Sequence, residues 1–301
     1  MPELPEVEVL RRGLNPALQG RRLQRMQIVN PRLRWPVSKE LQQACLGQTL
    51  IEVSRRSKYL LFRFPTGTML VHLGMSGTVQ WFKADAPLQK HDHVLWEFEG
   101  LPSLRFNDPR RFGSVLWLDE AADGAAPDGA APDEAAPDKA APTAEQKMHA
   151  PQRAQALLAR LGLEPFDCAF SGQHLYRMSR KRRLAVKPWL LSGEPVVGVG
   201  NIYACEALFR AGIDPRRSAA RISRARYERL AAAIVEVLHE AIVAGGSSLR
   251  DFVGSHGQSG DFQSRYAVYG RAGKPCKQCA APIRRIVQTQ RSSFACLKCQ
   301  R

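Results

Sequence analysis

Residues 51–73 read IEVSRRSKYLLFRFPTGTMLVHL, and large apolar side chains recur at every second position in each half of this stretch. Pro65-Thr66-Gly67 separates the two halves and is typical of a turn. A period of two is typical of β-strands that bury one face. The same period returns further along the chain, at Val94, Trp96, Phe98, Leu104, Phe106, Val115 and Trp117. Seven or eight short strands of this kind predict a β-sandwich.

A short helix is expected before these strands. Leu4, Val7, Leu10 and Leu14 are spaced by three, three and four residues, which places them on one helical face. Gly13 or Asn15-Pro16 is expected to end the helix. The sequence therefore predicts an α+β protein whose N-terminal helix leads into the sandwich.

The residues before this helix carry reactive groups. Pro2 follows Met1 directly, and removal of Met1 would leave a secondary amine at the N-terminus. Such an amine can attack an electrophilic carbon and remain attached as an iminium. Glu3 and Glu6 are close enough to transfer the protons that this chemistry needs. Proline and glutamate in a first helical turn are also ordinary capping residues, so both interpretations stay open at this point.

Four cysteines at the other end follow the pattern Cys276-x2-Cys279-x16-Cys296-x2-Cys299. Two CxxC pairs at this separation are typical of a tetrahedral zinc site, and a closed set of four thiolates predicts a structural ion. Two disulfides are the alternative. Between the pairs, residues 283–294 form two strand-like segments around a polar centre, which predicts a hairpin with Arg291 at its tip.

The charge balance favours a nucleic-acid partner. The chain has 44 Lys and Arg against 28 Asp and Glu, a net charge of +16 in 301 residues. No apolar run approaches the length of about 18 residues that a membrane span needs. Unpaired thiols and the absence of an apolar leader predict a cytoplasmic protein, with packing roles for the remaining cysteines, Cys45, Cys168 and Cys205.

Composition changes sharply at residues 121–147, where Ala-Ala-Pro-Asp recurs with a period of five from Ala125. Such a stretch lacks the apolar surface that stable packing requires, and it predicts a linker. The period beyond it is helical, with expected helices at 151–162, at 201–212 with Asn201 as N-cap, and from Ser223 to Gly245. We therefore expect four segments: residues 1–120, 121–150, 151–262 and 263–301.

Six motifs occur together and in order, and with them the chain resembles the formamidopyrimidine-DNA glycosylases, bacterial enzymes that act on oxidised purines. The resemblance covers every segment except the Ala/Pro linker, which the family lacks. The motifs are residues 1–8, Lys58 within 56–59, 72–77, 107–113, 198–204 and the terminal CxxC pairs.

The resemblance implies a helix-two-turn-helix domain after the linker, a zinc-finger hairpin with one structural Zn²⁺ per chain, and the following roles. Pro2 would be the nucleophile at C1′ of the damaged nucleotide. Glu3 would protonate the sugar oxygen, and Glu6 would support this geometry. Lys58, Asn201 and Arg291 would bind the phosphates, Lys58 and Arg291 as part of the catalytic set.

Further DNA contacts are expected at His93 and Lys187, while Met75, Arg110 and Phe112 would fill the gap that the extruded nucleotide leaves. The Gly-rich segment 245–260 would cover the extruded base. The resemblance implies a monomer acting on double-stranded DNA with an oxidised purine, with no membrane association and no nucleotide cofactor.

Two alternatives remain at this stage. The sister endonuclease VIII branch shares Pro2 and Glu3 but prefers oxidised pyrimidines; Leu4 and the Met75, Arg110 and Phe112 set favour the purine branch. A zinc-finger protein that binds DNA without catalysis would keep the charge and the thiolates, but it has no need for Pro2, Glu3 and Lys58.

Overall fold

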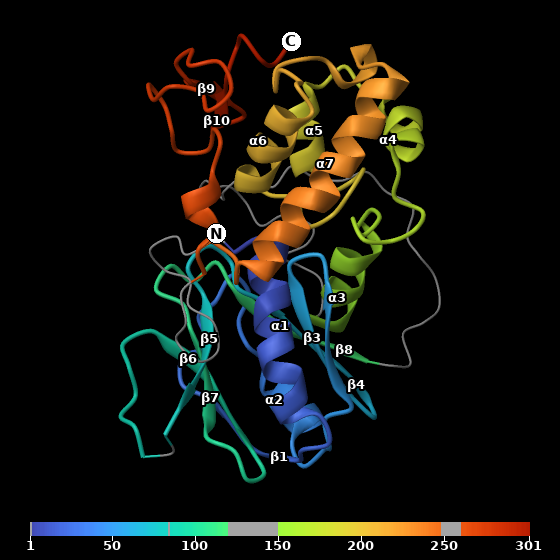
Figure 1. Cartoon of the computed structure of the whole chain (residues 1–301). Helices are drawn as coiled ribbons and strands as arrows, with labels where there is room; N and C mark the ends of the chain where they lie inside the picture. Colours follow the sequence, from blue (N-terminus) through green and yellow to red (C-terminus); the bar gives the residue numbers. More distant parts are fainter. Residues whose placement is uncertain (1, 84, 120–149, 248–259) are drawn as a thin grey trace. The chain divides into compact units, whose positions relative to one another are not determined.

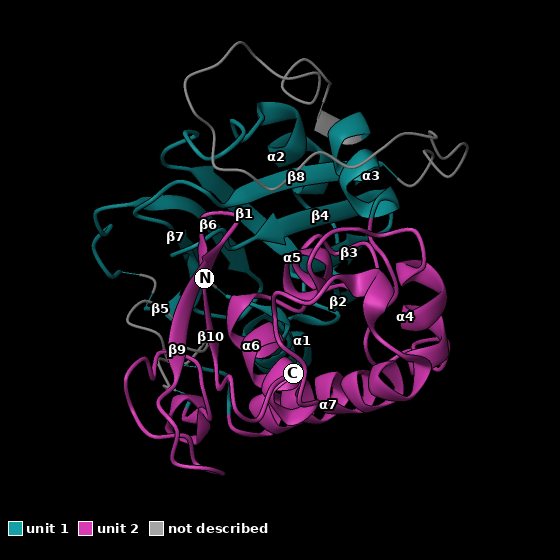
Figure 2. Ribbon diagram, turned by 90° about the horizontal axis from the view of Figure 1, so that it is seen from above, with its two compact units in different colours: residues 1–160, 245–260 teal, residues 161–244, 261–301 magenta. Residues whose placement is uncertain are grey.

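The computed structural model describes residues 2–83, 85–119, 150–247 and 260–301. Internal contacts divide the chain into two compact units (Figure 2). Unit 1 comprises Met1–Arg160 and Gly245–Gly260, and unit 2 comprises Leu161–Ala244 and Asp261–Arg301. The predicted linker and the greater part of the Gly-rich segment lie outside the described residues. None of the described helices combines the length and the apolar character that a membrane crossing requires.

Unit 1 contains the predicted sandwich, built from two four-stranded antiparallel sheets (Figure 1). One sheet has the order β1 (Leu23–Ile28), β6 (Asp92–Phe98), β7 (Ser103–Asn107) and β5 (Thr78–Phe82). The other has the order β2 (Glu52–Arg56), β3 (Tyr59–Phe64), β4 (Gly67–His72) and β8 (Ser114–Asp119).

The alternating apolar residues form the core of this sandwich. Leu60, Phe62, Trp96 and Phe106 are 0% exposed and belong to one apolar cluster. Each large side chain contributes roughly 1.5–3 kcal/mol when it is fully buried. The fixed register of both sheets therefore follows from the period of two, because a slip of one residue would expose the whole set.

The β3–β4 hairpin requires glycine at the first residue of β4, Gly67. Phe64 pairs with Gly67, so Pro65 and Thr66 make the turn. A Cβ at Gly67 would lie 2.5 Å from the carbonyl oxygen of Leu118 and 2.6 Å from the Trp117 ring. Strand β8 can pack here only because residue 67 has no side chain.

Helix α1 (Leu4–Leu18) buries the predicted stripe of leucines and valine. Its predicted end was wrong, because the helix continues through Pro16 to Leu18. Leu14 and Leu18 are both fully buried, and this packing outweighs the one hydrogen bond that Pro16 cannot donate in the last turn. Asn15 does not end the helix; its Oδ1 accepts a hydrogen bond from the Val53 backbone N–H (2.6 Å).

Two elements of unit 1 extend the sequence-based picture. Helix α2 (Lys39–Cys45) was not predicted; Ser38 caps it by accepting from the Leu41 N–H (3.2 Å). Helix α3 (Ala150–Ala159) was predicted, but in the helical domain. In the structure Ala154 packs into a cluster with residues of unit 1, namely Trp35, Leu70 and Leu116. The internal contacts thus place the boundary between the two units after Arg160. The limits of the four predicted segments stay a prediction.

Unit 2 is mainly helical. Helix α7 (Arg224–Val243) buries its predicted face, which consists of Tyr227, Leu230, Ile234, Leu238 and Ile242. Two short helices, α4 (Gly172–Ser179) and α5 (Val186–Leu191), were not predicted. The remaining helical elements are α6 (Asn201–Arg210) and the 3₁₀ turns η3 (Ala219–Arg221) and η4 (Phe262–Arg265).

The predicted hairpin is confirmed as β9 (Arg284–Gln288) and β10 (Arg291–Ala295). Thr289 and Gln290 form its turn with φ values of 42° and 61°, which suits a tight hairpin turn. The segment around the hairpin shares one apolar cluster with Cys205 and Phe209 of α6. The hairpin is therefore packed on the helices of unit 2.

Candidate functional site

Pro2, Glu3 and Glu6 are buried together at the start of α1. Glu3 and Glu6 are 2% and 1% exposed. One carboxylate oxygen of Glu6 accepts from the Glu3 backbone N–H (2.8 Å), and the other accepts from the Ser247 backbone N–H (2.8 Å). Glu6 is thus held by backbone donors from both ends of unit 1. Met1 lies outside the described residues.

Glu8 lies two residues after Glu6 in α1 and pairs with several arginines. It pairs with Arg11 (2.9 Å), Arg12 (2.8 Å) and Arg55 of β2 (3.2 Å). Burial alone would raise the pKa of Glu8, but hydrogen bonds from Arg11 and Arg12 outweigh it and hold the pKa below its usual value. The carboxylate therefore stays ionised at neutral pH and fixes α1 against β2.

Arg55 also supports the turn that carries Lys58. Arg55 Nη1 donates to the carbonyl oxygen of Ser57 (2.9 Å), and Ser57 has a φ of 56°. Lys58 follows in the β2–β3 turn and is half-buried. Within the described part of the chain, Lys58 makes no ion pair. Its ammonium group thus remains available to an anion such as a phosphate.

Met75 and Phe112 lie on two turns that touch one another. Gly74 has a φ of 61°, and a Cβ there would lie 2.4 Å from the carbonyl carbon of Phe112. Met75 is 37% exposed, which is unusual for so large an apolar side chain beside a closed core. The exposed Arg110 guanidinium lies 5.0 Å from the centre of the Phe112 ring. The structure therefore brings Met75, Arg110 and Phe112 together.

His93 does not offer its ring to a ligand. It is 0% exposed, and its Nδ1 and Nε2 lie 2.9 Å and 3.1 Å from the carbonyl oxygens of Asn30 and Asp108. The predicted DNA contact through His93 is not available in this conformation, because both nitrogens are engaged. His91 is half-buried at a φ of 78° and is the more accessible imidazole of the two. The sequence showed two similar histidines and no signal that separated them.

Lys187 in unit 2 is likewise buried, at 1% exposure. Its Nζ donates to Asn201 Oδ1 (2.5 Å), Ser293 Oγ (2.8 Å) and the Ser292 carbonyl oxygen (3.2 Å). A direct DNA contact through Lys187 is therefore not available either, since its three donors are all used within the unit. Lys187 instead fixes α6 against β10.

Asn201 and Arg291 lie beside Lys187: Asn201 binds it directly, and Arg291 precedes Ser292, whose carbonyl oxygen accepts from Lys187. Asn201 is the first residue of α6, and Gly200 is the N-cap, one position earlier than predicted. The Asn201 side chain also donates from Nδ2 to the Ser292 carbonyl oxygen (3.1 Å). Arg291 opens β10 directly after the turn, opposite Gln288, and is half-buried. Unit 2 thus holds an amide and a guanidinium on neighbouring segments.

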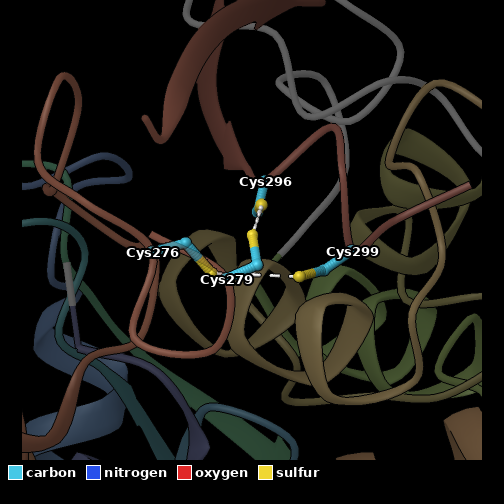
Figure 3. A group of neighbouring side chains, drawn as sticks. All are labelled: Cys276, Cys279, Cys296 and Cys299. Carbon is cyan, nitrogen blue, oxygen red and sulfur yellow. Dashed lines mark hydrogen bonds between the residues drawn. The ribbon is translucent and has the colours of Figure 1, made fainter. Parts of the chain in front are cut away.

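The four C-terminal cysteines converge on one point (Figure 3). Their sulfur atoms all lie within 4.8 Å of one another, with 3.4 Å between Cys279 and Cys296 and 3.9 Å between Cys276 and Cys299. A tetrahedron of thiolates around Zn²⁺ at about 2.3 Å requires sulfur separations of about 3.8 Å, so the set fits such an ion. Among the described residues, no other three or more His, Cys, Asp or Glu side chains come together in this way.

All cysteines are free thiols, which argues against the two-disulfide alternative. Cys45 and Cys205 are buried, as expected for packing roles, and burial raises the pKa of the Cys45 thiol to about 12. The expectation for Cys168 was wrong, because this residue is exposed.

Comparisons with known proteins support one family across the whole chain. Residues 1–115 match the model of the formamidopyrimidine-DNA glycosylase N-terminal domain, and residues 161–253 match that of the formamidopyrimidine-DNA glycosylase H2TH domain. The formamidopyrimidine-DNA glycosylase of Burkholderia thailandensis is 50% identical over 304 residues, with 100% of both chains covered. The chain belongs to the formamidopyrimidine-DNA glycosylase family.

Solved structures of the formamidopyrimidine-DNA glycosylase family share this fold. The MutM (Fpg) protein of Thermus thermophilus is 35% identical, with a TM-score of 0.81 over 99% of this chain and 98% of that one. A Lactococcus lactis Fpg mutant in complex with Fapy-dG-containing DNA is 29% identical, with a TM-score of 0.83 and full coverage of both chains. The resemblance and the α+β fold inferred from the sequence are therefore confirmed.

Proposed function

We propose that this chain is a DNA glycosylase and abasic-site lyase that removes oxidised purines from double-stranded DNA. The observation that carries the proposal is the buried start of α1, where Pro2, Glu3 and Glu6 lie together in a chain of this family. A helix N-terminus disfavours a nearby cation, so it favours the neutral, nucleophilic form of the Pro2 amine.

In the proposed reaction, the Pro2 nitrogen forms a bond to C1′ while the bond from C1′ to the damaged base breaks. The base leaves with the electron pair and takes up a proton. Glu3 protonates the ring oxygen as the C1′–O4′ bond opens, and the nitrogen, having lost its own proton, becomes an iminium. Glu6 holds the backbone of Glu3 in place through the 2.8 Å hydrogen bond.

Strand cleavage follows from the same iminium. Loss of a proton from C2′ expels the 3′ phosphate by β-elimination, and loss of a proton from C4′ expels the 5′ phosphate by δ-elimination. No external oxidant or reductant is needed, because each phosphate leaves with the electrons of its own C–O bond. A protonated leaving base and an iminium acting as an electron sink supply the driving force.

DNA binding is supported by charge and by the relatives. Lys58, Asn201 and Arg291 can each donate to phosphate oxygens, and a net charge of +16 favours a polyanion. Lactococcus lactis Fpg has been solved with DNA that contains an abasic site. We propose that Met75, Arg110 and Phe112 fill the space of the extruded nucleotide and that one Zn²⁺, held by the four cysteines, has a structural role.

Borohydride trapping tests the proposal. The protein is incubated with a duplex that contains 8-oxoguanine opposite cytosine, reduced, and digested for mass mapping of the cross-linked peptide. We expect one adduct, on Pro2. Pro5→Ala is the matched control, because it changes a nearby proline, in the first turn of α1, that has no free amine, and it should trap equally well.

Two results would contradict the proposal in different ways. No adduct from protein whose N-terminus is confirmed as Pro2 would leave a DNA-binding protein without this chemistry. An adduct that forms faster on a duplex with an oxidised pyrimidine would place the chain with the endonuclease VIII type of specificity. The comparison with an oxidised-pyrimidine duplex is needed because Lactococcus lactis Fpg has also been solved with oxidised-pyrimidine DNA.

A further inference from the structure

Asp108 lies in the loop between β7 and β8 and is 0% exposed. Its carboxylate accepts hydrogen bonds from two loops at once. Oδ1 accepts from Ser76 Oγ (2.7 Å) and from the Arg110 backbone N–H (3.2 Å), and Oδ2 accepts from the Gly113 backbone N–H (2.8 Å). Among the described residues, no lysine or arginine side chain pairs with this carboxylate.

The main chain of Asp108 makes further contacts. Its N–H donates to the His91 carbonyl oxygen (3.0 Å), and its own carbonyl oxygen lies 3.1 Å from His93 Nε2. The Arg111 N–H also donates to this carbonyl oxygen (3.3 Å). Asp108 is therefore the point at which three segments of unit 1 are joined.

Two of these segments carry the side chains proposed to enter the duplex. Met75 lies between Gly74, which packs on the Phe112 backbone, and Ser76, which donates to Asp108. On the other side, Phe112 is preceded by Arg111 at a φ of 60° and followed by Gly113, whose N–H binds Asp108. A non-glycine residue at positive φ is strained and persists only where its surroundings hold it.

We propose that Asp108 is a positioning residue that holds Met75, Arg110 and Phe112 in the arrangement needed to enter the duplex before DNA binds. The inference rests on the proposed function of these three side chains. A buried carboxylate with several donors is rigid, and rigid support lowers the ordering that binding would otherwise require. Asp108 acts only through the two turns and touches no reacting atom.

Ser76→Ala tests this role with little risk to folding, because it removes one donor and leaves the Asp108 carboxylate in place. The first substrate is a duplex with 8-oxoguanine opposite cytosine, in which a gap must be filled. The second is a single-stranded oligonucleotide with an abasic site, in which there is no base to extrude and no opposite strand. Iminium trapping on the second substrate reports the Pro2 chemistry alone.

We expect Ser76→Ala to lower the single-turnover excision rate on the duplex about 10-fold and Asp108→Asn about 100-fold, as for misplacement of a positioning group. Trapping on the single strand should stay within about 2-fold for both variants. Ser38→Ala is the matched control. It removes a serine hydrogen bond at the N-terminus of α2, in the same unit, and should leave both substrates unaffected.

A double-mutant comparison adds a second criterion. In a Met75→Ala background, Ser76→Ala should have little further effect, because the side chain that it positions is already gone. Equal losses on both substrates, or fully additive effects, would overturn the positioning role. If the wild-type protein forms no adduct on either substrate, the proposed lyase function fails, and the inference falls with it.

Discussion

The β9–β10 hairpin of unit 2 and the two turns around Asp108 in unit 1 present side chains to the same proposed partner, but they are held in different ways. The hairpin has a set of four thiols at its base that fits a metal ion. The turns are held by a carboxylate that the chain itself supplies. If a metal fills the thiol set, as we propose, one region is completed by an added ion and the other by a side chain of the chain itself.

The difference follows from what lies beneath each region. Strand β9 is mostly exposed, with Val287 at 66%, and a two-stranded hairpin alone is marginally stable. The turns around Asp108 rest on the closed core of the sandwich, where Phe106 is fully buried. Strand β9 itself has little apolar cover, so we propose that a metal completes the hairpin, whereas the turns on the closed core are held by a few directed hydrogen bonds.

The largest effect expected from this comparison is loss of the metal. Structural zinc supplies about 10–16 kcal/mol of apparent folding free energy in zinc-finger peptides. Cys296→Ala, or chelation, should therefore unfold the hairpin and weaken DNA binding about 100-fold, the equivalent of two lost charge-assisted contacts. Fluorescence anisotropy measures the binding, and elemental analysis measures the metal per chain.

Cys168→Ala provides the control, because it removes an exposed cysteine outside the cluster. It should keep one metal ion per chain and full affinity. If Cys296→Ala keeps the affinity of the wild type, the hairpin does not depend on its metal, and the contrast between the two regions disappears.

An intermediate effect is expected at Glu206 of α6, where unit 2 also uses a buried carboxylate. Its oxygens accept from the backbone N–H groups of Ala267, Val268 and Tyr269, at 2.8, 3.0 and 2.8 Å. Glu206→Gln replaces one acceptor with a donor and should cost about 1.5–3 kcal/mol of unfolding free energy. Urea unfolding measures the difference.

The matched control is Glu240→Gln on α7, which removes a partly exposed partner of Arg210. We expect it to cost under about 1 kcal/mol, as for most surface ion pairs. Equal costs for the two variants would show that a carboxylate that binds backbone N–H groups stabilises unit 2 no more than a surface charge does.

The smallest effect is expected at Glu8, whose pKa lies below its usual value of 4.5. A depressed pKa means that the carboxylate stabilises the folded state above the pKa of the unfolded chain and loses this effect as the pH falls through the folded pKa. Glu8→Gln should therefore lower the Tm at pH 7. The loss of unfolding free energy should be under about 1 kcal/mol, because Arg11 and Arg12 are partly exposed.

The difference in Tm between wild type and Glu8→Gln should hold from pH 7 to about 5 and shrink below 4.5. Thermal unfolding at several pH values measures it. A difference that grows on acidification would have the wrong sign for an ionised, arginine-paired carboxylate.

The sequence predicted the elements whose burial is one-sided. Leu60 and Phe62 alternate because one face of β3 meets the core, and the stripe on α7 repeats because one face of that helix is buried. Helices α4 and α5 were missed because eight and six residues are too few to show a helical period.

Long-range partners explain what the sequence could not show. His93 and Lys187 are polar residues that look accessible in the sequence, yet the first contacts Asn30, 63 positions away, and the second contacts Ser293, 106 positions away. Periodicity also placed α3 correctly as a helix but could not show that Ala154 packs with Trp35. Asp108 was quoted within a motif, but its role depends on Ser76, 32 positions earlier.

The hydrogen bond from Ser247 to Glu6 has a consequence for protein synthesis. It joins residues 241 positions apart, within a unit whose chain leaves after Arg160 and returns at Gly245. At about 5–20 residues per second, a ribosome needs roughly 12–50 s to reach Ser247. Through that interval the nascent chain carries Pro2 and Glu3, but the Ser247 N–H that donates to Glu6 has not yet been synthesised. The N-terminal end that we propose to be reactive, although translated first, is therefore among the last parts of the molecule to be finished.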